Sequence, residues 1–379
     1  MKSFVLVTGD FVKTGGMDRA NHALASFLAK RGDDVHLVAY RAADDLLAQK
    51  NVTFHAVKKI RGSYFLSSPR LKREGMKWAR DIAKKGGRVV VNGGNCPFDD
   101  VNWVHHVHAA DQPPLAGGFA HRFKIAFSRR LFCREEKKTI PGARTILTGC
   151  VRTKTDLIEK LGVDGAKVYP VYYGVDAKLF QPADPAQRAA TRTLLGWDDR
   201  PYVAFIGALG DRRKGFDRLF EAWAKLCQQK EWDAKLVVVG RGKEQPLWQE
   251  RAKARGLLEG NRMQFLGFVK DLPGMLAACD AHVLPSRYEG YSLVTQEAIC
   301  SGIPAFVTNT AGIAERFPTD LHNLLLPDTD DITELVHRLS QWRRDIPGYR
   351  AKVAPFSQEL RSCTWEAMAE KIVEIIEAN

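Results

Sequence analysis

Short apolar runs alternate with longer amphipathic stretches along the whole chain of 379 residues. The apolar runs are rich in β-branched side chains, which is typical of buried strands. In the first half we expect strands at 3–8, 35–38, 88–91, 103–107, 145–148 and 167–171. In the second half we expect them at 202–206, 236–239, 263–266, 281–285 and 305–308. Strands that alternate with helices predict parallel sheets covered on both faces.

The pattern is interrupted once, over the polar and proline-containing stretch 176–200. We therefore predict an N-terminal domain at 1–175, a linker with one short helix at 176–200 and a C-terminal domain at 201–355. The last stretch, 356–379, contains an amphipathic helix that we expect to pack back on the first domain. The predicted fold class is α/β, with two doubly wound, Rossmann-like domains that face each other across a cleft.

Composition and charge indicate a soluble globular protein with an anionic partner. Hydrophobic residues make up 45% of the chain and charged residues 27%, as in soluble globular proteins. No apolar run reaches the ~20 residues of a membrane span, and the seven cysteines form no CxxC pair, so we expect a cytoplasmic protein without disulfides. The net charge of +13 is one-sided: residues 1–175 carry +14 and the rest −1. This asymmetry indicates an anionic partner such as a phosphorylated lipid, a membrane face or a nucleic acid.

The most specific string is Pro-Ser-Arg-Tyr-Glu-Gly-Tyr-Ser-Leu-Val-Thr-Gln-Glu-Ala, at 285–298. A strand ends, a glycine turn follows, and we expect a helix to begin near Ser292. The free N–H groups of a helix start, here around Gly290, Tyr291 and Ser292, suit a phosphate. Glu297, further along the helix, could then accept hydrogen bonds from a ribose, while Glu289 meets the group beyond the phosphates.

This string resembles the retaining GT-B glycosyltransferases of the GT4 type (glycosyl transferases group 1), whose C-terminal domain has a glutamate, seven residues and a second glutamate. Here the pair is Glu289 and Glu297, and Gly302-Ile303-Pro304 also fits the pattern. The resemblance covers nearly the whole chain. It implies a hexosyltransferase that uses a nucleotide-diphosphate sugar, with Glu289 as a catalytic residue and no catalytic metal or other cofactor.

Two further loops of the C-terminal half fit the resemblance. The loop 205–216 resembles the family's second phosphate loop, which assigns Lys214 to the donor diphosphate with Arg212 or Arg213 as its helper. Fixed cations stabilise the charge that develops on a leaving diphosphate. Many relatives have arginine where this chain has Ala208, so one of the two arginines replaces it or phosphate binding is weaker. The loop at 266–269 implies that Phe268 and Val269 meet the nucleotide base.

In the N-terminal half, Gly15 and Gly16 resemble the family's Gly-Gly loop, which approaches the donor and the acceptor. On the strand expected at 103–107, His106 and His108 would share a face and His105 would point away. The family has a histidine near this position that contacts the donor sugar. We favour His108, with His106 second, and a structural role for these histidines stays open. A metal site would need three or four ligands, and no carboxylate is fixed beside them.

The acceptor side is predicted from basic stretches interleaved with phenylalanine. Arg122 and Lys124 belong to one of them, together with His106 on the same side. Cations mixed with aromatic side chains suit an anionic membrane, RNA or a phosphorylated glycan. A solvated helix face over a buried aromatic stripe is the structural alternative.

The sequence therefore predicts a retaining transferase that moves a sugar from a nucleotide-diphosphate sugar, with UDP as the expected nucleotide, to an anionic glycan or lipid-linked acceptor. Such an enzyme would serve the synthesis of cell-envelope polysaccharide or lipopolysaccharide, at the inner face of the membrane and without nucleic acid. The alternatives are a nucleotide-sugar epimerase or hydrolase of the same fold, and a basic nucleic-acid-binding protein with a degenerate transferase fold. A nicotinamide-dependent dehydrogenase is excluded, because no GxGxxG follows the first strand. The sugar, the acceptor, the base and the oligomeric state stay open.

Overall fold

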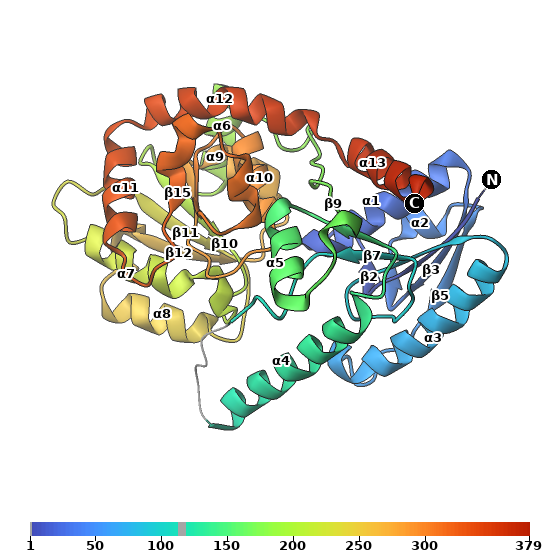
Figure 1. The fold of residues 1–379 in the computed structure, drawn as a ribbon. Coiled ribbons are helices and arrows are strands. Elements are labelled where there is room, and N and C mark those ends of the chain that lie inside the picture. Colours follow the sequence, from blue (N-terminus) through green and yellow to red (C-terminus); the bar gives the residue numbers. More distant parts are fainter. Residues whose placement is uncertain (1, 113–118) are drawn as a thin grey trace. The chain divides into compact units, whose positions relative to one another are not determined.

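The computed structural model describes residues 2–112 and 119–379, apart from the side chains of 119–121 and 124. The chain forms two compact units (Figure 1). Unit 1 comprises Met1–Gly174 and Cys363–Asn379, and unit 2 comprises Val175–Ser362. Each unit is built around a parallel sheet, as the alternation of strands and helices predicts.

The strands of unit 1 pair in parallel in the order β5-β3-β1-β6-β7-β8-β9. Their bounds are β1 Ser3–Val7, β3 Asp34–Ala39, β5 Val52–Ala56, β6 Arg88–Val91, β7 Val101–Val104, β8 Thr145–Thr148 and β9 Val168–Pro170. A short parallel pair, β2 (Asp10–Phe11) and β4 (Arg41–Ala42), follows β1 and β3. The chain runs outward from β1 to β5 and then returns to β6. The sheet therefore changes direction between β1 and β6, which is where ligands of such sheets bind.

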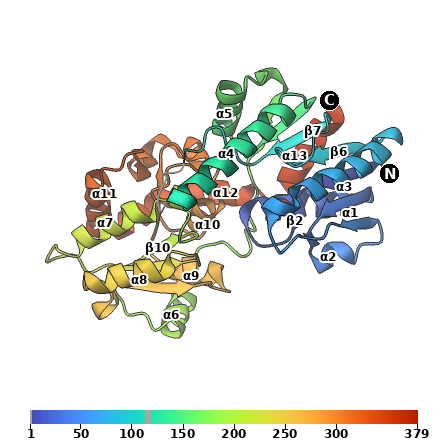
Figure 2. The same ribbon diagram turned by 90° about the horizontal axis from the view of Figure 1, so that it is seen from below.

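Helices cover both faces of this sheet. They are α1 Gly16–Arg31, α2 Asp44–Leu47, α3 Tyr64–Lys84, α4 Phe119–Thr139, α5 Val151–Leu161, the 3-10 turn η1 Gly165–Lys167, and α13 Trp365–Ala378. Val5 and Val7 of β1 pack in one core cluster with Leu71 and Ile82 of α3, which crosses the sheet in Figure 2. The C-terminal α13 lies beside α1 (Figure 1). Apolar residues on alternate sides of β1 thus anchor a helix layer on each face.

The strands of unit 2 pair in parallel in the order β12-β11-β10-β13-β14-β15. Their bounds are β10 Tyr202–Ile206, β11 Lys235–Val239, β12 Met263–Gly267, β13 Ala281–Leu284, β14 Ala305–Thr308 and β15 Leu325–Leu326. The chain runs outward from β10 to β12 and then returns to β13 beside β10. The change of direction therefore lies between β10 and β13.

The helices of unit 2 again lie on both faces. They are α6 Pro185–Leu194, α7 Phe216–Leu226, α8 Gln245–Ala254, α9 Leu272–Ala278, α10 Leu293–Cys300, α11 Thr333–Arg344 and α12 Ile346–Ser362. Shorter 3-10 turns are η2 Arg212–Lys214, η3 Glu259–Asn261, η4 Gly312–Arg316 and η5 Thr319–Leu324. In the view of Figure 1, α10 and α12 lie above this sheet and α7 and α8 below it.

Several expected boundaries differ from the structure. The strand expected at 103–107 ends at Val104, and the edge strands β5 and β15 were not expected. The stretch 176–200, expected as a linker, is grouped with unit 2, and its helix α6 packs against α9. The stretch 356–379 also contains the end of α12, which belongs to unit 2. The expected amphipathic helix is α13, which begins after Thr364, whose hydroxyl caps it, and is grouped with unit 1.

Candidate active site

The loop after β13 carries Glu289 and Tyr291 at the carboxyl edge of the sheet of unit 2. It is fixed by backbone hydrogen bonds to the following turn η4. Gly312 N donates to Glu289 O (3.1 Å), and Ile313 N donates to Tyr291 O (2.9 Å). The Tyr291 hydroxyl donates to Oε1 of Gln296 in α10 (2.6 Å). These hydrogen bonds fix the backbone of the loop and therefore the position of Glu289.

The helix start that the sequence predicts near Ser292 is confirmed, because α10 begins at Leu293 with Ser292 as its N-cap. Ser292 has φ 86° and ψ 80°, in the left-handed region that a side chain other than glycine rarely adopts. Its hydroxyl lies 2.8 Å from that of Thr295, so it is held within the first turn. Strained backbone of this kind concentrates at ligand-binding loops, and a helix start is suited to an anion.

Lys214 and Glu289 form an ion pair in unit 2, although they lie 75 residues apart in the sequence. Lys214 ends η2, which follows β10, and Glu289 follows β13. The pair therefore lies at the point where the sheet changes direction. Gly215 permits this approach: it has φ 69°, and a Cβ on it would lie 1.9 Å from the carbonyl oxygen of Pro285. A side chain at this position would push the two loops apart.

The two arginines expected to help Lys214 have acidic partners in the same loop region. Arg212 Nη2 lies 3.4 Å from Glu244, and Arg213 donates through Nε and Nη2 to Asp211 at 2.9 and 2.7 Å. Ala208 lies near the start of this loop, at the position where many relatives are expected to have arginine. An incoming diphosphate would have to compete with these carboxylates for either arginine.

Arg287 was missed as a site residue by the sequence analysis. Its backbone N–H donates to Arg213 O (2.7 Å), and its guanidinium donates to Arg212 O (2.9 Å) and to both carboxylate oxygens of Asp217 (2.8 Å each). Arg287 thus ties the loop of Lys214 to the loop of Glu289. Its position could have indicated this role, because Arg287 lies two residues before Glu289 within the most specific string.

Glu297 is 3% exposed in α10, the helix that α12 covers. Burial of a carboxylate is costly unless it is paired, so this position carries a constraint beyond helix formation. Phe268 and Val269, assigned to the base, directly follow β12 at the same edge of the sheet, and the Phe268 side chain is 66% exposed.

The acidic Asp-Thr-Asp segment, 328–330, is engaged by arginines. Arg218 donates to Asp330 at 2.8 Å and to Asp328 at 3.1 Å, and Arg287 also donates to Asp330. The next residue, Asp331, lies just before α11, and its carboxylate accepts from Thr333 N (2.9 Å). Within residues 2–112 and 119–379, no group of three or more His, Cys, Asp or Glu side chains could hold a metal ion.

In unit 1, Gly15 is the N-cap of α1, with φ 82° and ψ 160°, and Gly16 is the first residue of the helix. The glycine loop therefore follows β1 and β2 at the carboxyl edge, next to the change of direction between β1 and β6. Arg19 donates back to Gly15 O (3.2 Å) and fixes the first turn.

Asp18 in the same turn leads to a pH prediction. Burial and the neighbouring Asp10 raise its pKa from 3.8 to about 6, against the opposing effect of Arg41 and Lys59. Between these two values the folded protein binds more protons than the unfolded chain, so the free energy of unfolding falls as pH rises and the loss is complete above about pH 6. Asp18→Asn should therefore raise the Tm above pH 6, and the gain should vanish below pH 4. A gain that is equal at both pH values would contradict this assignment.

The histidines do not lie on a strand, because β7 ends at Val104. The alternation expected for them is therefore wrong. His105 is enclosed: its Nδ1 lies 2.5 Å from the Tyr173 hydroxyl and its Nε2 3.1 Å from Asn92 Nδ2. Burial lowers the pKa of His105 to about 3, so this ring is neutral. The Tyr173 hydroxyl fixes the orientation of this ring.

His106 and His108 nevertheless lie side by side, with ring centroids 4.6 Å apart. His106 Nε2 lies 3.4 Å from Asp111, and His108 Nδ1 lies 2.6 Å from the buried Glu136 of α4. The side chain of His108 is 37% exposed and that of His106 24%. His108 is thus the most accessible of the three, and a carboxylate orients its ring.

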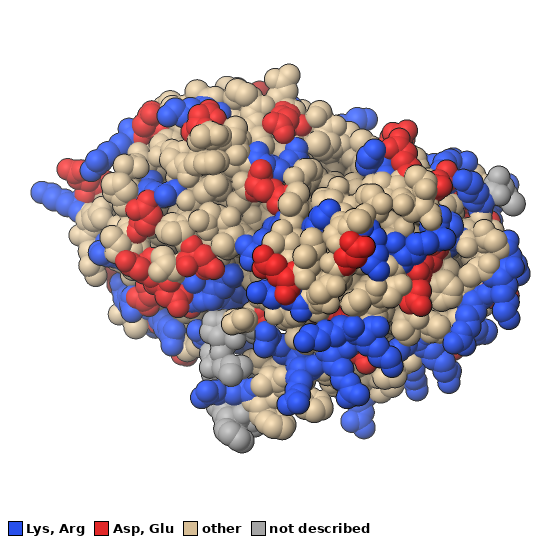
Figure 3. All heavy atoms as spheres, in the orientation of Figure 1, with Lys and Arg blue, Asp and Glu red and all other residues tan. Residues whose placement is uncertain are grey.

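The basic stretch assigned to the acceptor forms α4. Arg122 is exposed on this helix, and the side chain of Lys124 lies outside the described residues. Figure 3 shows lysine and arginine side chains gathered over α4 and α3. Among the described helices, none is both long and apolar enough to cross a membrane.

Comparisons with known proteins agree with this architecture. The family model described as Glycosyltransferase Family 4 matches residues 14–179, and the model described as Glycosyl transferases group 1 matches residues 200–345. A mannosyltransferase of Corynebacterium glutamicum, GDP-mannose-dependent and named for a monoacylated phosphatidylinositol monomannoside, is 30% identical over 219 residues, which cover 54% of this chain and 55% of that protein. The lipopolysaccharide core mannosyltransferase LpsB of Rhizobium meliloti is 28% identical over 48% of this chain and 53% of its own. The chain thus spans about half the length of these curated relatives.

Solved structures show the same fold over the whole chain. Sucrose-phosphate synthase from Thermosynechococcus elongatus superposes with a TM-score of 0.77 at 20% identity, over 100% of this chain and 99% of that one. WaaG, a glycosyltransferase of lipopolysaccharide biosynthesis, superposes with a TM-score of 0.76 at 20% identity over both entire chains. Together with the two family models, these similarities show that the chain belongs to the glycosyltransferases of the GT4 type (group 1) and has the GT-B fold.

Proposed function

We propose that this protein transfers a sugar from a nucleotide-diphosphate sugar to a glycan or lipid-linked acceptor. The observation that carries the proposal is the pairing of Lys214 with Glu289 where the sheet of unit 2 changes direction. A cation and a carboxylate at this point match the two ends of an activated sugar, whose phosphates need positive charge and whose hydroxyls need acceptors.

The ion pair suggests how the donor would bind. Lys214 and Glu289 neutralise each other in their ion pair. The donor diphosphate would take over Lys214, assisted by an adjacent arginine and by the N–H groups at the start of α10, and the sugar hydroxyls would take over Glu289. The negative charge that develops on the leaving diphosphate is then met by groups already in position. Because these groups supply the positive charge, we propose that transfer needs no metal.

We further propose that the anomeric configuration is retained. Glu289 is the carboxylate that we assign to the sugar, and its ion pair with Lys214 suits it to orient hydroxyls rather than to attack carbon. A front-face reaction, in which the donor phosphate receives the proton of the acceptor hydroxyl, needs no protein nucleophile. His108 would contact the donor sugar, and Gly15 and Gly16 would approach the diphosphate.

The nucleotide and the acceptor are the finer parts of the proposal. The sequence predicts UDP; one relative is named for GDP-mannose, and a solved neighbour of this fold contains UDP-glucose. Relatives named for a phosphatidylinositol mannoside and for the lipopolysaccharide core support a lipid-linked or envelope glycan as acceptor. We propose that the enzyme works on such an acceptor at the cytoplasmic face of the membrane.

The proposal is tested by a thermal-shift panel of UDP-, GDP- and ADP-hexoses, because a bound ligand raises Tm by mass action. The stabilising donor is then incubated with lipid-linked glycans in the presence of EDTA, and the configuration of the product is read by NMR. Transfer with retention is expected. A panel without any stabilising donor would refute the proposal, and an altered donor sugar without an acceptor would favour an epimerase or hydrolase.

Glu297→Ala should weaken nucleotide binding about tenfold and change kcat little, since a ribose contact is made equally in the ground state and the transition state. The measurement is the Kd of the stabilising nucleotide together with kcat. Glu315→Ala, an exposed carboxylate on η4, is the control. A fall in kcat at unchanged Kd would contradict the assignment to ribose.

We also propose that the exposed face of α4 contacts an anionic membrane. Phe123 and Phe127 are 64% and 57% exposed, and their rings stack 6.3 Å apart among arginines. Burying such rings in a lipid interface contributes hydrophobic free energy beside the attraction of the cations. Phe123→Ser/Phe127→Ser should reduce binding to phosphatidylglycerol vesicles about tenfold or more in sedimentation, whereas Leu194→Ser, an exposed leucine of unit 2, should not. Equal losses in both variants would contradict a specific role of α4.

A further inference from the structure

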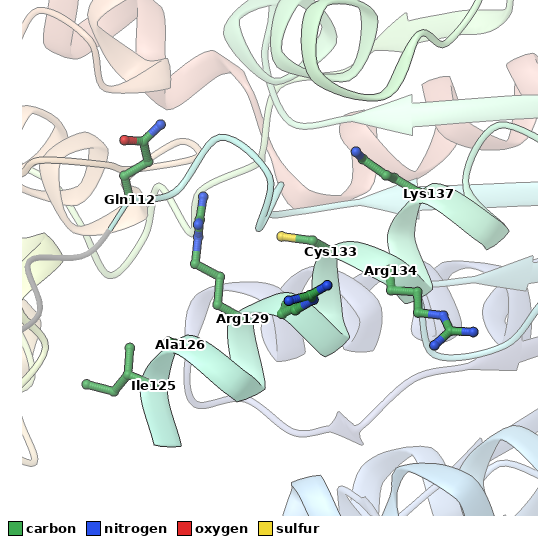
Figure 4. A pocket seen from close by; sticks show the side chains of 8 residues that line it. Gln112, Ile125, Ala126, Arg129, Cys133, Arg134 and Lys137 are labelled. Carbon is green, nitrogen blue, oxygen red and sulfur yellow. The ribbon is translucent and has the colours of Figure 1, made fainter. Parts of the chain in front are cut away.

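A cavity of about 830 Å³ lies against α4 in unit 1. The residues that line it are Gln112, Ile125, Ala126, Arg129, Arg130, Cys133, Arg134 and Lys137. In Figure 4 the side chains of Arg129, Cys133 and Lys137 rise from the same side of the helix on successive turns, and Gln112 lies across from them. This volume is typical of small-molecule sites.

The cavity has a one-sided charge. Among its described lining residues, four are cationic and none is acidic. The two glutamates of α4 are engaged elsewhere: Glu135 pairs with Lys72 (2.6 Å) and Glu136 with His108 (2.6 Å). Cations that line one cavity repel one another, and an anion bound there would stabilise them.

Two of the cations lie along one side of the cavity. Arg129 and Lys137 lie two helical turns apart, on either side of Cys133, which places their cations along one side of the cavity. Arg129 is also fixed, because its Nε donates to Asp111 O (2.7 Å) in the segment that carries His106 and His108. Within the described part of the chain, no acidic side chain pairs with Arg130 or Lys137.

The remaining lining residues suit a sugar. Ile125 and Ala126 offer apolar surface for a ring, and the Gln112 amide can both donate to and accept from hydroxyls. We propose that this pocket binds a phosphate monoester of the acceptor. This inference rests on the proposed transfer reaction and names the chemistry of its acceptor; the donor diphosphate is assigned to Lys214 in unit 2.

The test is calorimetric titration of the full-length protein with glucose 6-phosphate and, as a matched neutral probe, with glucose. Binding of the phosphate ester is expected, with the Kd raised about tenfold by Arg130→Gln and by Lys137→Gln, because each removes one charge-assisted contact. Lys138→Gln, the next residue on the same helix but outside the pocket, should leave the Kd unchanged. Equal affinity in wild type and both pocket variants overturns the proposal.

Cys133 reports where the ligand binds. Burial and nearby Glu136 raise the pKa of its thiol, so labelling with iodoacetamide is done at alkaline pH and followed by peptide mass spectrometry. Glucose 6-phosphate should slow labelling of Cys133 but not of Cys363, and Lys137→Gln should weaken this protection. Protection by phosphatidic acid vesicles but not by glucose 6-phosphate would place the phosphate on a lipid. Protection by neither ligand overturns the proposal.

The outcome is separable from the proposed function. Nucleotide-sugar binding is measured on the same samples by thermal shift. If a donor binds and transfers its sugar but the pocket variants keep wild-type affinity for glucose 6-phosphate, only the pocket assignment fails. If no nucleotide sugar binds, the proposed function fails, and the titrations still decide whether the pocket takes a phosphate.

Discussion

Lys214→Ala is expected to lower kcat about 100- to 1000-fold while raising the Kd of the nucleotide less than about tenfold. The reason is that Lys214 would meet charge that develops fully only as the diphosphate departs. Its ammonium is held at the site by the ion pair with Glu289, so the donor would only exchange one anionic partner of Lys214 for another. The measurement is kcat by steady-state kinetics and Kd by calorimetry with the stabilising nucleotide.

A control variant and a double variant show whether the loss of kcat in Lys214→Ala comes from the missing cation. Lys225→Ala removes an exposed lysine from the following helix α7 and should leave kcat unchanged. Lys214→Ala also leaves Glu289 without its ion partner, so Lys214→Ala/Glu289→Gln shows whether the loss comes from the missing cation or from an unbalanced carboxylate. Recovery of kcat in the double variant would contradict a direct role of Lys214 on the diphosphate.

Much of the fold was predictable because its central strands are buried on both faces. All five residues of β11, Lys235–Val239, are buried, and such strands stand out as continuous apolar runs. The edge strand β5 carries Thr53 and His55 and did not stand out. The strand expected at 103–107 runs past the end of β7 because Val107 is apolar, and this side chain is indeed buried although it lies beyond the last strand residue. Burial marks the core, but it does not distinguish a strand from the loop that follows it.

The sequence predicts the separate loops of the candidate site but not the contacts between them. The spacing of Glu289 and Glu297 lies within a single string of sequence and required no knowledge of contacts. The pairing of Glu289 with Lys214 joins residues 75 positions apart, and the fold alone brings them together. The sequence alone makes Arg287 resemble a solvated loop cation, whereas in the structure Asp217 of α7 accepts two of its hydrogen bonds. Contacts between loops depend on strand order, which local periodicity does not contain.

The amino ends of β10 and β13 are joined by one buried carboxylate, Asp280, which is 6% exposed. Its Oδ1 accepts from Arg188 (2.8 Å) and Arg350 (3.0 Å), and its Oδ2 accepts from Arg192 (2.6 Å) and from Tyr202 N (2.9 Å). The same two strands carry Lys214 and Glu289 in the loops at their opposite ends. Asp280 thus fixes the strands between which the proposed donor site lies, and it also holds α6 and α12 to this sheet.

Asp280→Asn should lower the free energy of unfolding of unit 2 by about 3 kcal/mol, because it leaves three partly buried arginines without their shared counter-charge. The measurement is native-state hydrogen exchange of the full-length protein, which reads β10 and β13 separately from β1 and β3 of unit 1. Asp233→Asn is the control, because Asp233 pairs with Arg343 at a more exposed site. The side chains of Asp233 and Arg343 are 41% and 34% exposed, so this substitution should lower the free energy of unfolding by less than about 1 kcal/mol. A similar small cost in both variants would mean that the arginines around Asp280 are solvated well enough to do without it, and that strand and helix packing alone hold β10 beside β13.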